Sequence, residues 1–431
     1  MSERDQALVV RGGDVVDSDG RRRADVAVRG GVITAVEPVI EAGSGVLVLD
    51  ASDCVVAPGL VDLHTHLREP GGEEAETVET GSRAAALGGY TAVVAMPNTD
   101  PPLDSAAVVS QVLELGRSAL CDVRVAGAIT VGRKGAQLAP MAELAALGVR
   151  LFTDDGAGVQ DSRLMRRAME YSVTLGVTLA QHCEDAALAA GGHMHEGAWS
   201  SRLGIPGIPA EAEELMVMRD IALSRLTGAP IHFLHLSTAG SVAMVRAAKA
   251  QGLPVTAEAA PHHFTLTDAE ARSFDPVFKV NPPLRTEGDV AAVRRGLVEG
   301  VIDAIATDHA PHAQEAKEAP WDEAPPGMLG LETALALALT ELDLPVERVL
   351  ALLSWQPARL AGVADEHGGP LCPGRPANLT VIDPQHRWVV DAERLASRSR
   401  NTPYAGRTLC GRVRHTVLRG EPVVIGGEPQ G

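Results

Sequence analysis

Two histidines one residue apart, His64 and His66, stand where an apolar stretch of the chain gives way to a turn rich in glycine and proline. Side chains alternate between the two faces of a β-strand, so these imidazoles would point the same way at a strand end. Paired imidazoles on one face supply half of a metal site. A chance pairing of two histidines is the alternative, and the remaining residues have to decide between the two interpretations.

Arg68 continues the same alternation beyond the histidine pair. A guanidinium beside a metal favours a substrate that carries a carboxylate or a phosphate. The chain has a net charge of −18, so an anionic substrate would need such a locally positive pocket. The same charge argues against nucleic acid or an anionic membrane as a partner.

The composition is that of a folded enzyme. The 431 residues are 45% hydrophobic and 22% charged, enough for one large domain and a smaller one. No run approaches the ~20 apolar residues that a membrane span needs. The five cysteines are odd in number and lack Cys-x-x-Cys spacing, which predicts reduced thiols and a cytoplasmic location.

The central part of the chain alternates between short apolar runs and Ala-rich amphipathic stretches of helical length. The apolar runs cover residues 56–63, 91–96, 123–128, 149–153, 177–181, 231–236, 254–258 and 302–307. Helices are expected at residues 79–87, 105–115, 163–175, 210–226 and 241–250. Eight strand–helix alternations predict an α/β fold and, within that class, a (β/α)8 barrel of the TIM type.

The two ends of the chain have a different sequence pattern, in which β-prone runs are separated by tight turns. These runs cover residues 8–16, 24–28, 32–36, 377–382, 388–390, 413–418 and 422–425. Neither end has enough apolar surface to fold alone. We therefore expect one small β-sandwich domain made of residues 1–56 plus 368–431, with a catalytic barrel domain at residues 57–367.

A barrel of this kind carries its active site at the carboxyl ends of its strands and in the loops that follow. Chemically suitable residues stand at four more of these ends: the pair Asp154 and Asp155, then His182, His235 and Asp308. Together with the first histidine pair they fit a dinuclear centre, in which one carboxylate is shared by two metals.

Each of these residues also has an ordinary structural explanation. An aspartate pair before Gly156 is typical of a turn, lone histidines often belong to a core, and Asp308 could pair with Arg285 or cap a helix. Five strand ends would all have to carry such residues by accident, so the metal centre is favoured. Three more histidines near strand ends are interpreted as supporting rather than ligating: His232, His262 and His263.

With these residues in place, the chain resembles the amidohydrolase superfamily and, within it, the class I dihydroorotases. The resemblance covers nearly all of residues 7–425. It is carried by His64-Thr65-His66-Leu67-Arg68-Glu69-Pro70-Gly71, Met96-Pro97-Asn98-Thr99, Asn281-Pro282-Pro283-Leu284-Arg285 and Thr307-Asp308-His309-Ala310-Pro311-His312. The His-x-His pattern alone marks only the superfamily, whereas the other elements together are much more specific.

The resemblance implies one or two zinc ions per chain, with two favoured. His64 and His66 would bind one zinc, His182 and His235 the second, and Asp155 would bridge them. Asp308 would be both a ligand and the catalytic acid and base. The sequence itself leaves a one-residue ambiguity between Asp154 and Asp155.

The resemblance also implies a small-molecule substrate, through the interconversion of N-carbamoyl-L-aspartate and L-dihydroorotate in pyrimidine biosynthesis. Arg68 and Asn98 would hold the substrate carboxylate with help from His312, beside the ligand His66. The pyrimidine ring would contact Asn281 and the backbone around Pro326 and Gly327.

One departure from the wider superfamily concerns the bridging group. Many members bridge the metals with a carboxylated lysine, but residues 149–156 contain no lysine. The bridge must therefore be an aspartate, which is shorter than a lysine carbamate. Full occupancy of both metal positions is less firmly implied as a result.

Two other functions remain open. Hydantoinases and allantoinases open cyclic amides on the same scaffold, although the missing lysine and the presence of Arg68 with Asn98 count against them. An inactive homologue could scaffold aspartate transcarbamoylase, although such a protein should have lost ligands. Association with that enzyme is also compatible with activity, and a homo-oligomer is expected. The proline-rich segment 310–329 is either a mobile lid or an ordered surface loop.

Overall fold

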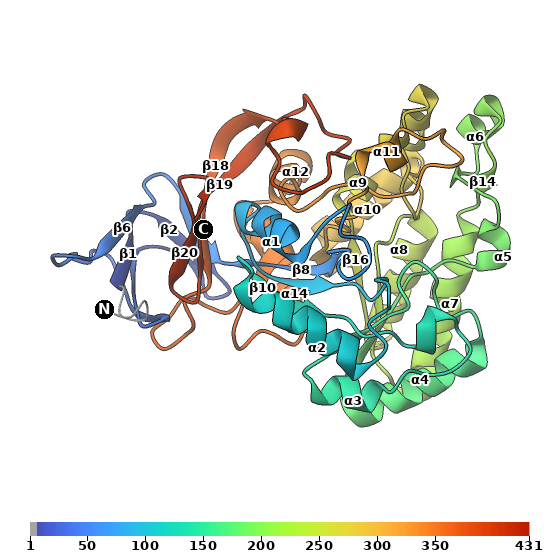
Figure 1. Cartoon of the computed structure of the whole chain (residues 1–431), viewed down its shortest axis with the longest axis horizontal. Coiled ribbons are helices and arrows are strands. Elements are labelled where there is room, and N and C mark those ends of the chain that lie inside the picture. Colours follow the sequence, from blue (N-terminus) through green and yellow to red (C-terminus); the bar gives the residue numbers. More distant parts are fainter. Residues whose placement is uncertain (1–6, 431) are drawn as a thin grey trace.

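The computed structural model describes residues 7–430, so residues 1–6 and 431 of the expected small domain lie outside the described part of the chain. The fold is a mixed α/β architecture, which confirms the predicted class. Figure 1 shows a sheet-rich part, where the blue strands β1, β2 and β6 lie near the red strand β20, beside a larger part in which helices surround strands.

Eight parallel strands occupy the larger part. They are β8 (Leu60–Thr65), β9 (Tyr90–Ala95), β10 (Asp122–Val125), β11 (Leu151–Phe152), β12 (Thr178–Gln181), β15 (Ile231–Phe233), β16 (Val255–Ala259) and β17 (Ala304–Ile305). The first three form one sheet and the other five form a second. Parallel bridges connect these sheets at both seams, Gly127 with Phe152 and Thr65 with His309, so the last strand returns to the first.

A helix follows each parallel strand, as the amphipathic stretches predict. These helices are α1 (Val78–Leu87), α2 (Ala106–Leu115), α3 (Met141–Ala146), α4 (Ser162–Leu175), α7 (Glu211–Thr227), α8 (Ala239–Ala250), α10 (Glu287–Glu299) and α12 (Ala334–Glu341). Local sequence sets their ends: Thr286 and Asp289 form a capping box at the start of α10, and Gly300 ends it at φ 74°. The parallel strands and helices bury one large core of aliphatic and aromatic side chains.

Shorter elements extend the loops on the carboxyl side of the strands. Between β12 and α7 lie α5 (Ala186–Ala189), β13 (Met194–His195), α6 (Ala198–Leu203) and β14 (Gly207–Ile208). Further along are α9 (Pro261–Thr265) and α11 (Gln314–Lys317). Two helices after α12, α13 (Val346–Leu350) and α14 (Gln356–Leu360), flank a single π-helical turn.

Two further sheets share a core, one built from N-terminal strands and the other from strands of both ends of the chain. One sheet has the order β5 (Val32–Glu37), β4 (Asp25–Arg29), β1 (Ala7–Arg11) and β6 (Leu47–Asp50). The other has the order β21 (Glu428–Pro429), β20 (Glu421–Ile425), β19 (Thr408–Leu418), β18 (Leu379–Val389), β7 (Val55–Pro58), β2 (Asp14–Asp17) and β3 (Gly20–Arg23). Leu8, Val26, Val56, Val381 and Val417 belong to the buried cluster they share.

The structure differs from the sequence interpretation in how this part is assembled. The run at residues 56–63 is not one strand, because β7 pairs with β18 and β2 while β8 pairs with β9. The break falls at Gly59, where a Cβ atom would lie 2.2 Å from the Thr91 hydroxyl oxygen. The expected run at 388–390 is instead largely the end of the long strand β18. Strands β3 and β6 were not anticipated.

Within residues 7–430, helices that are both long and apolar enough to cross a bilayer are absent. All five cysteines are free thiols.

Candidate metal centre and active site

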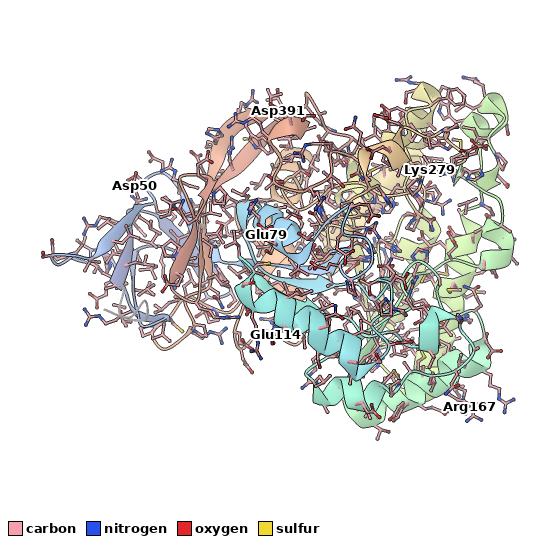
Figure 2. All side chains as sticks on the ribbon, viewed as in Figure 1. Asp50, Glu79, Glu114, Arg167, Lys279 and Asp391 are labelled. Atoms are coloured by element: carbon pink, nitrogen blue, oxygen red, sulfur yellow. The ribbon has the colours of Figure 1, made fainter. Side chains whose placement is uncertain are left out.

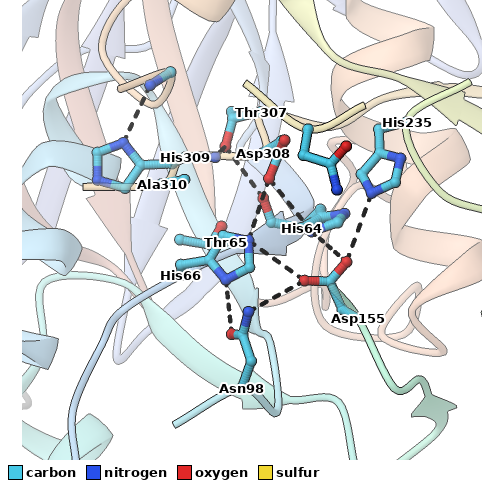
Figure 3. A network of polar contacts seen from close by, with 12 residues as sticks. His64, Thr65, His66, Asn98, Asp155, His235, Thr307, Asp308, His309 and Ala310 are labelled. Carbon is cyan, nitrogen blue, oxygen red and sulfur yellow. Dashed lines mark hydrogen bonds and ion pairs between the residues drawn. The ribbon is translucent and has the colours of Figure 1, made fainter. Parts of the chain in front are cut away.

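The candidate ligands lie at or just beyond the carboxyl ends of five parallel strands. His64 is on β8 and His66 follows it, while Asp155 follows β11 and His182 follows β12. His235 follows β15 and Asp308 follows β17. Figure 3 shows five of these side chains converging on one point: His64, His66, Asp155, His235 and Asp308. All six candidate side chains are buried, although up to 244 positions separate them in sequence.

Asp155 occupies the middle of this cluster. Its Oδ1 lies 3.5 Å from His64 Nε2, 3.5 Å from His182 Nδ1 and 3.6 Å from His235 Nε2. Its Oδ2 lies 3.6 Å from His66 Nε2. The two carboxylate oxygens therefore face different histidines, which is the disposition a bridging ligand requires.

Asp154 has a different role, which separates the two aspartates. Its Oδ1 accepts the backbone N–H groups of Ile129 and Thr130, at 2.8 and 3.0 Å, and its Oδ2 contacts the Thr130 hydroxyl. Asp154 thus fixes the loop after β10 to the loop after β11. Of the pair, only Asp155 is directed at the histidines.

Asp308 closes the other side of the cluster. Its Oδ1 lies 3.2 Å from His66 Nε2 and 3.5 Å from His64 Nε2. Its Oδ2 lies 3.8 Å from His262 Nε2. Arg285, a sequence-level alternative partner for Asp308, instead binds Ser237 Oγ and the carbonyl oxygen of Ile208.

The spacing of these atoms suits a divalent cation. Ligand atoms at about 2.0–2.1 Å from a tetrahedral zinc are about 3.3 Å apart, and the contacts around Asp155 and Asp308 fall close to that value. His182 Nδ1 and His235 Nε2 face each other at 3.0 Å. His64 Nε2 is buried and has no hydrogen-bond partner among the described residues. The residues therefore fit a metal centre of mixed nitrogen and oxygen ligands.

A buried carboxylate fixes the orientation of His64. His64 Nδ1 donates to Glu258 Oε1 at 2.9 Å, which leaves its Nε2 free to face Asp155 and Asp308. The other oxygen of Glu258 accepts from His232 Nε2 at 3.0 Å. Such carboxylate–histidine pairs commonly orient metal-binding imidazoles. Sequence reasoning missed Glu258, and the available signal was a glutamate at the end of a buried apolar run.

The other two supporting histidines also lie close to the cluster. His262 faces Asp308, and His263 Nε2 donates to the carbonyl oxygen of Pro282 at 3.0 Å. Neither reaches Asp155 within 4.0 Å in the part of the chain that the structure describes.

The backbone is strained at this site. Arg68, His235 and Asp308 adopt positive φ angles of 61°, 32° and 47°. Side chains other than glycine rarely occupy this region, and such residues concentrate at functional sites, where surrounding structure holds them in place. All three of these residues line one cavity.

The expected substrate side chains border this cavity, which has a volume of about 170 Å³. Arg68 Nε donates to the Pro311 carbonyl oxygen at 3.1 Å, and its Nη2 lies 3.4 Å from His312 Nε2. Asn281 Nδ2 lies 3.5 Å from His182 Nε2, while Asn281 Oδ1 is buried without a hydrogen-bond partner among residues 7–430. Pro326 and Gly327 line the same cavity.

Asn98 lies between the candidate metal ligands and the residues expected to bind the substrate. Its Oδ1 accepts from His66 Nδ1 at 2.8 Å, and its Nδ2 donates to Asp155 Oδ2 at 3.3 Å. Asn98 therefore also orients a histidine and the central carboxylate.

Electrostatics favour the anionic form of both central carboxylates. Burial alone would raise the pKa of Asp155, but the charge of His64 and contacts with His182 and His235 hold that pKa well below its ordinary value. The pKa of Asp308 is likewise lowered, because the His64 charge and the His66 contact outweigh the effect of burial. Two buried anions among imidazoles attract a cation.

Anionic carboxylates and imidazoles at the carboxyl ends of parallel strands, beside the partly buried Arg68, define an enzyme of the amidohydrolase class. Comparison with known proteins specifies the family. Residues 53–241 match the family model described as dihydro-orotase-like.

Full-length relatives give the same result. The chain is 50% identical to the dihydroorotase of Streptomyces coelicolor, over 97% of this chain and 99% of the relative. It is 49% identical to the dihydroorotase of Pelotomaculum thermopropionicum, over 97% and 98%. The chain belongs to the dihydroorotase family, which confirms the resemblance drawn from its motifs.

Solved structures share the fold. The L-hydantoinase (dihydropyrimidinase) of Arthrobacter aurescens superposes with a TM-score of 0.88 at 25% identity, covering 98% of this chain and 97% of that one. The D-hydantoinase (dihydropyrimidinase) of a Thermus species gives 0.84 at 26% identity, covering 98% and 96%. The likeness therefore includes both the helical part and the terminal sheets.

Proposed function

We propose that this protein is an active dihydroorotase, which cyclises N-carbamoyl-L-aspartate to L-dihydroorotate with loss of water, and reverses that reaction, in pyrimidine biosynthesis. The observation that carries the proposal is the convergence of Asp155 and Asp308 on four histidines, within 3.6 Å, beside Arg68. Relatives that carry the dihydroorotase name over nearly their whole length support it.

Zinc is the metal we propose for this centre, with two ions per chain. His64, His66 and Asp308 would hold one ion and His182 and His235 the other, with Asp155 shared; the 3.0–3.6 Å contacts between these atoms support the assignment. When bound, such ions polarise the ring amide carbonyl and lower the pKa of water.

Asp308 is the proposed proton carrier. Its lowered pKa leaves it anionic, so in the hydrolytic direction it can accept a proton from the attacking water. It then returns that proton to the ring nitrogen as the amide bond breaks. In the biosynthetic direction the same carboxyl group helps to expel water from the β-carboxylate.

The remaining pocket residues bind and orient the substrate. Arg68, with Asn98 and His312, is proposed to hold the carboxylate that does not react, so that the reacting atoms stay aligned. Burial lowers the pKa of Arg68 from its very high ordinary value, and a carboxylate would compensate for the desolvated charge. Asn281 and the backbone at Pro326 and Gly327 are proposed to contact the ring.

The architecture proposed for this function is a (β/α)8 barrel of TIM type with a small β-sandwich. The bridges that join the two parallel sheets at both seams support a closed barrel. The sandwich would comprise residues 1–56 plus 368–431 and the barrel residues 57–367. Because β7 pairs within the sandwich sheet, we propose to move the first boundary to Gly59.

Hydantoin opening is the second candidate activity, since the superposed structures carry hydantoinase names. The absence of lysine from residues 149–156 and the pairing of Asn98 with Asp155 count against it. Purified zinc-loaded protein should hydrolyse dihydroorotate far faster than hydantoin or allantoin. A preference for hydantoin or allantoin would reject the dihydroorotase assignment.

Other proposals concern the assembly and location of the enzyme. We propose a cytoplasmic homo-oligomer that can associate with aspartate transcarbamoylase. An inactive scaffold is disfavoured because no candidate ligand has been lost. Light scattering of the protein with and without aspartate transcarbamoylase tests the association, and zinc content distinguishes an enzyme from an inactive scaffold.

A further inference from the structure

The wall of the cavity formed by residues 325–327 is attached from behind by a buried lysine. Lys317, at the end of α11, is only 9% exposed. Its Nζ donates to the carbonyl oxygens of Pro325, Gly327 and Lys279, at 2.9, 3.1 and 3.4 Å. One ammonium therefore connects two separate stretches of backbone, residues 325–327 and Lys279.

A second lysine binds the turn that precedes residues 325–327. Lys279 is 6% exposed, and its Nζ donates to the carbonyl oxygens of Trp321 and Asp322 at 2.6 and 3.2 Å. The backbone carbonyl of Lys279 also accepts the Gly327 N–H at 2.9 Å. Figure 2 shows Lys279 in the helical part of the molecule, far from Asp50 in the terminal sheets.

Both ammonium groups lack the usual acidic partner. Neither forms an ion pair with any residue between 7 and 430; backbone carbonyls and His193 Nδ1 are their polar contacts there. Burial, followed by the charge of Lys279, lowers the pKa of Lys317 to about 7. Burying an ammonium without a counter-ion is costly, so a lysine placed here beside the cavity calls for a functional explanation.

The choice of lysine is also informative. The chain has four lysines, at positions 134, 249, 279 and 317, among 38 basic residues. Two of the four are these buried groups. An ammonium offers three tetrahedral donors from one point, which matches three converging carbonyls, whereas a planar guanidinium does not.

The attached wall contacts the groups expected to bind the substrate. Pro326 O accepts from His312 Nε2 at 2.8 Å, and a Cβ atom on Gly327 would lie 2.7 Å from the same nitrogen. His312 in turn faces Arg68. Movement of residues 325–327 would therefore displace both the ring-binding backbone and the carboxylate-binding side chains.

We propose that Lys317, supported by Lys279, is a positioning residue that holds residues 325–327 in the geometry that receives the substrate ring. The segment 310–329 is then a fixed wall rather than a mobile lid. This inference rests on the proposed dihydroorotase function, because the substrate defines which wall has to be positioned.

The test compares Lys317→Met and Lys317→Arg with the exposed control Lys134→Met. Loss of charge-assisted hydrogen bonds should raise the KM for dihydroorotate about tenfold in Lys317→Met, with kcat within about threefold and zinc content unchanged. Lys317→Arg should also have a raised KM, because its guanidinium keeps the positive charge but cannot direct three donors at the three carbonyl oxygens. Amide exchange should accelerate across residues 318–330 in both variants, and Lys134→Met should match the wild type.

Several outcomes would overturn the proposal. An unchanged KM in Lys317→Met, or a wild-type KM in Lys317→Arg, would show that the three-carbonyl attachment does not position the wall. Rapid exchange across residues 318–330 in the wild type would show that the wall is not fixed. If Lys317→Met does not fold, Lys317→Arg and the wild-type exchange rates still decide. Failure of the proposed function itself would appear separately, as absence of dihydroorotate hydrolysis by the wild type.

Discussion

Asp308 and Asp155 are both buried carboxylates beside histidines, yet their surroundings differ. Asp155 has contacts to four imidazoles, spread over both of its oxygens. Asp308 contacts His64 and His66 through Oδ1, and among residues 7–430 its Oδ2 has an ion-pair contact only with the more distant His262. An oxygen that is not fully engaged can receive and release a proton. This difference supports the bridging role proposed for Asp155 and the catalytic role proposed for Asp308.

Replacement of Asp308 by asparagine tests that division. Asparagine keeps one oxygen for the ligand position but cannot carry the proton, so kcat should fall by about 10²–10⁴-fold. Unfolding temperature and most of the zinc content should be retained. The exposed Asp343→Asn variant serves as the control. A near-native kcat in Asp308→Asn would rule out Asp308 as the proton carrier.

The sequence predicted most of these residues because their types and positions at strand ends are local features. The sequence could not decide whether Asp155 or Asp154 is the candidate bridging ligand. That choice depends on the loop at Thr130, whose backbone N–H groups bind the Asp154 carboxylate. Glu258 was missed because its partner His64 is 194 positions away. Lys317 was missed for a similar reason, as its acceptors are backbone carbonyls, which no side-chain pattern reveals.

At the scale of the elements, the apolar runs predicted the strands well, because burial on both faces of a parallel strand leaves an almost continuous apolar signal. The junction between β7 and β8 escaped this signal, since the apolar run continues across it. What separates the two strands is the close approach of Gly59 to Thr91, a contact 32 positions apart.

Gly59→Ala tests the importance of this junction. The new methyl group would lie 2.2 Å from the Thr91 hydroxyl oxygen, so the strands must shift, and we expect the free energy of unfolding to fall by about 1–3 kcal/mol. Gly43→Ala is the matched control, because nothing lies within 4 Å of its added methyl group. Equal denaturation midpoints for the two variants in urea would show that β7 and β8 tolerate a wider separation.

At the scale of the whole molecule, the terminal sheets and the helical part are joined by contacts between distant parts of the chain. Glu332, which precedes α12, accepts the backbone N–H of Ala396 at 2.8 Å. Burial raises the pKa of Glu332 to about 7, against hydrogen bonds from Ala396 and Ser397 and with help from the charge of Glu76. Between pH 4.5 and about 7, the folded protein therefore holds a proton on Glu332 that the unfolded chain has released.

This difference makes stability depend on pH. Between the ordinary glutamate pKa of 4.5 and about 7 the folded state holds more protons, so stability should decrease as pH rises through that window. Glu332→Gln removes this dependence. The unfolding temperature of the variant relative to that of the wild type should therefore rise from pH 5 to pH 8. Parallel curves for the two proteins across that range would contradict the assignment.

We propose that six converging side chains hold divalent metal and that the protein thereby opens the dihydroorotate ring. The most direct measurement is the rate of dihydroorotate hydrolysis as zinc is added to metal-free protein. We expect negligible activity without metal and a rise that saturates at one or two equivalents per chain. A metal-free enzyme with full activity, or a zinc-loaded enzyme with none, would contradict this metal-dependent function.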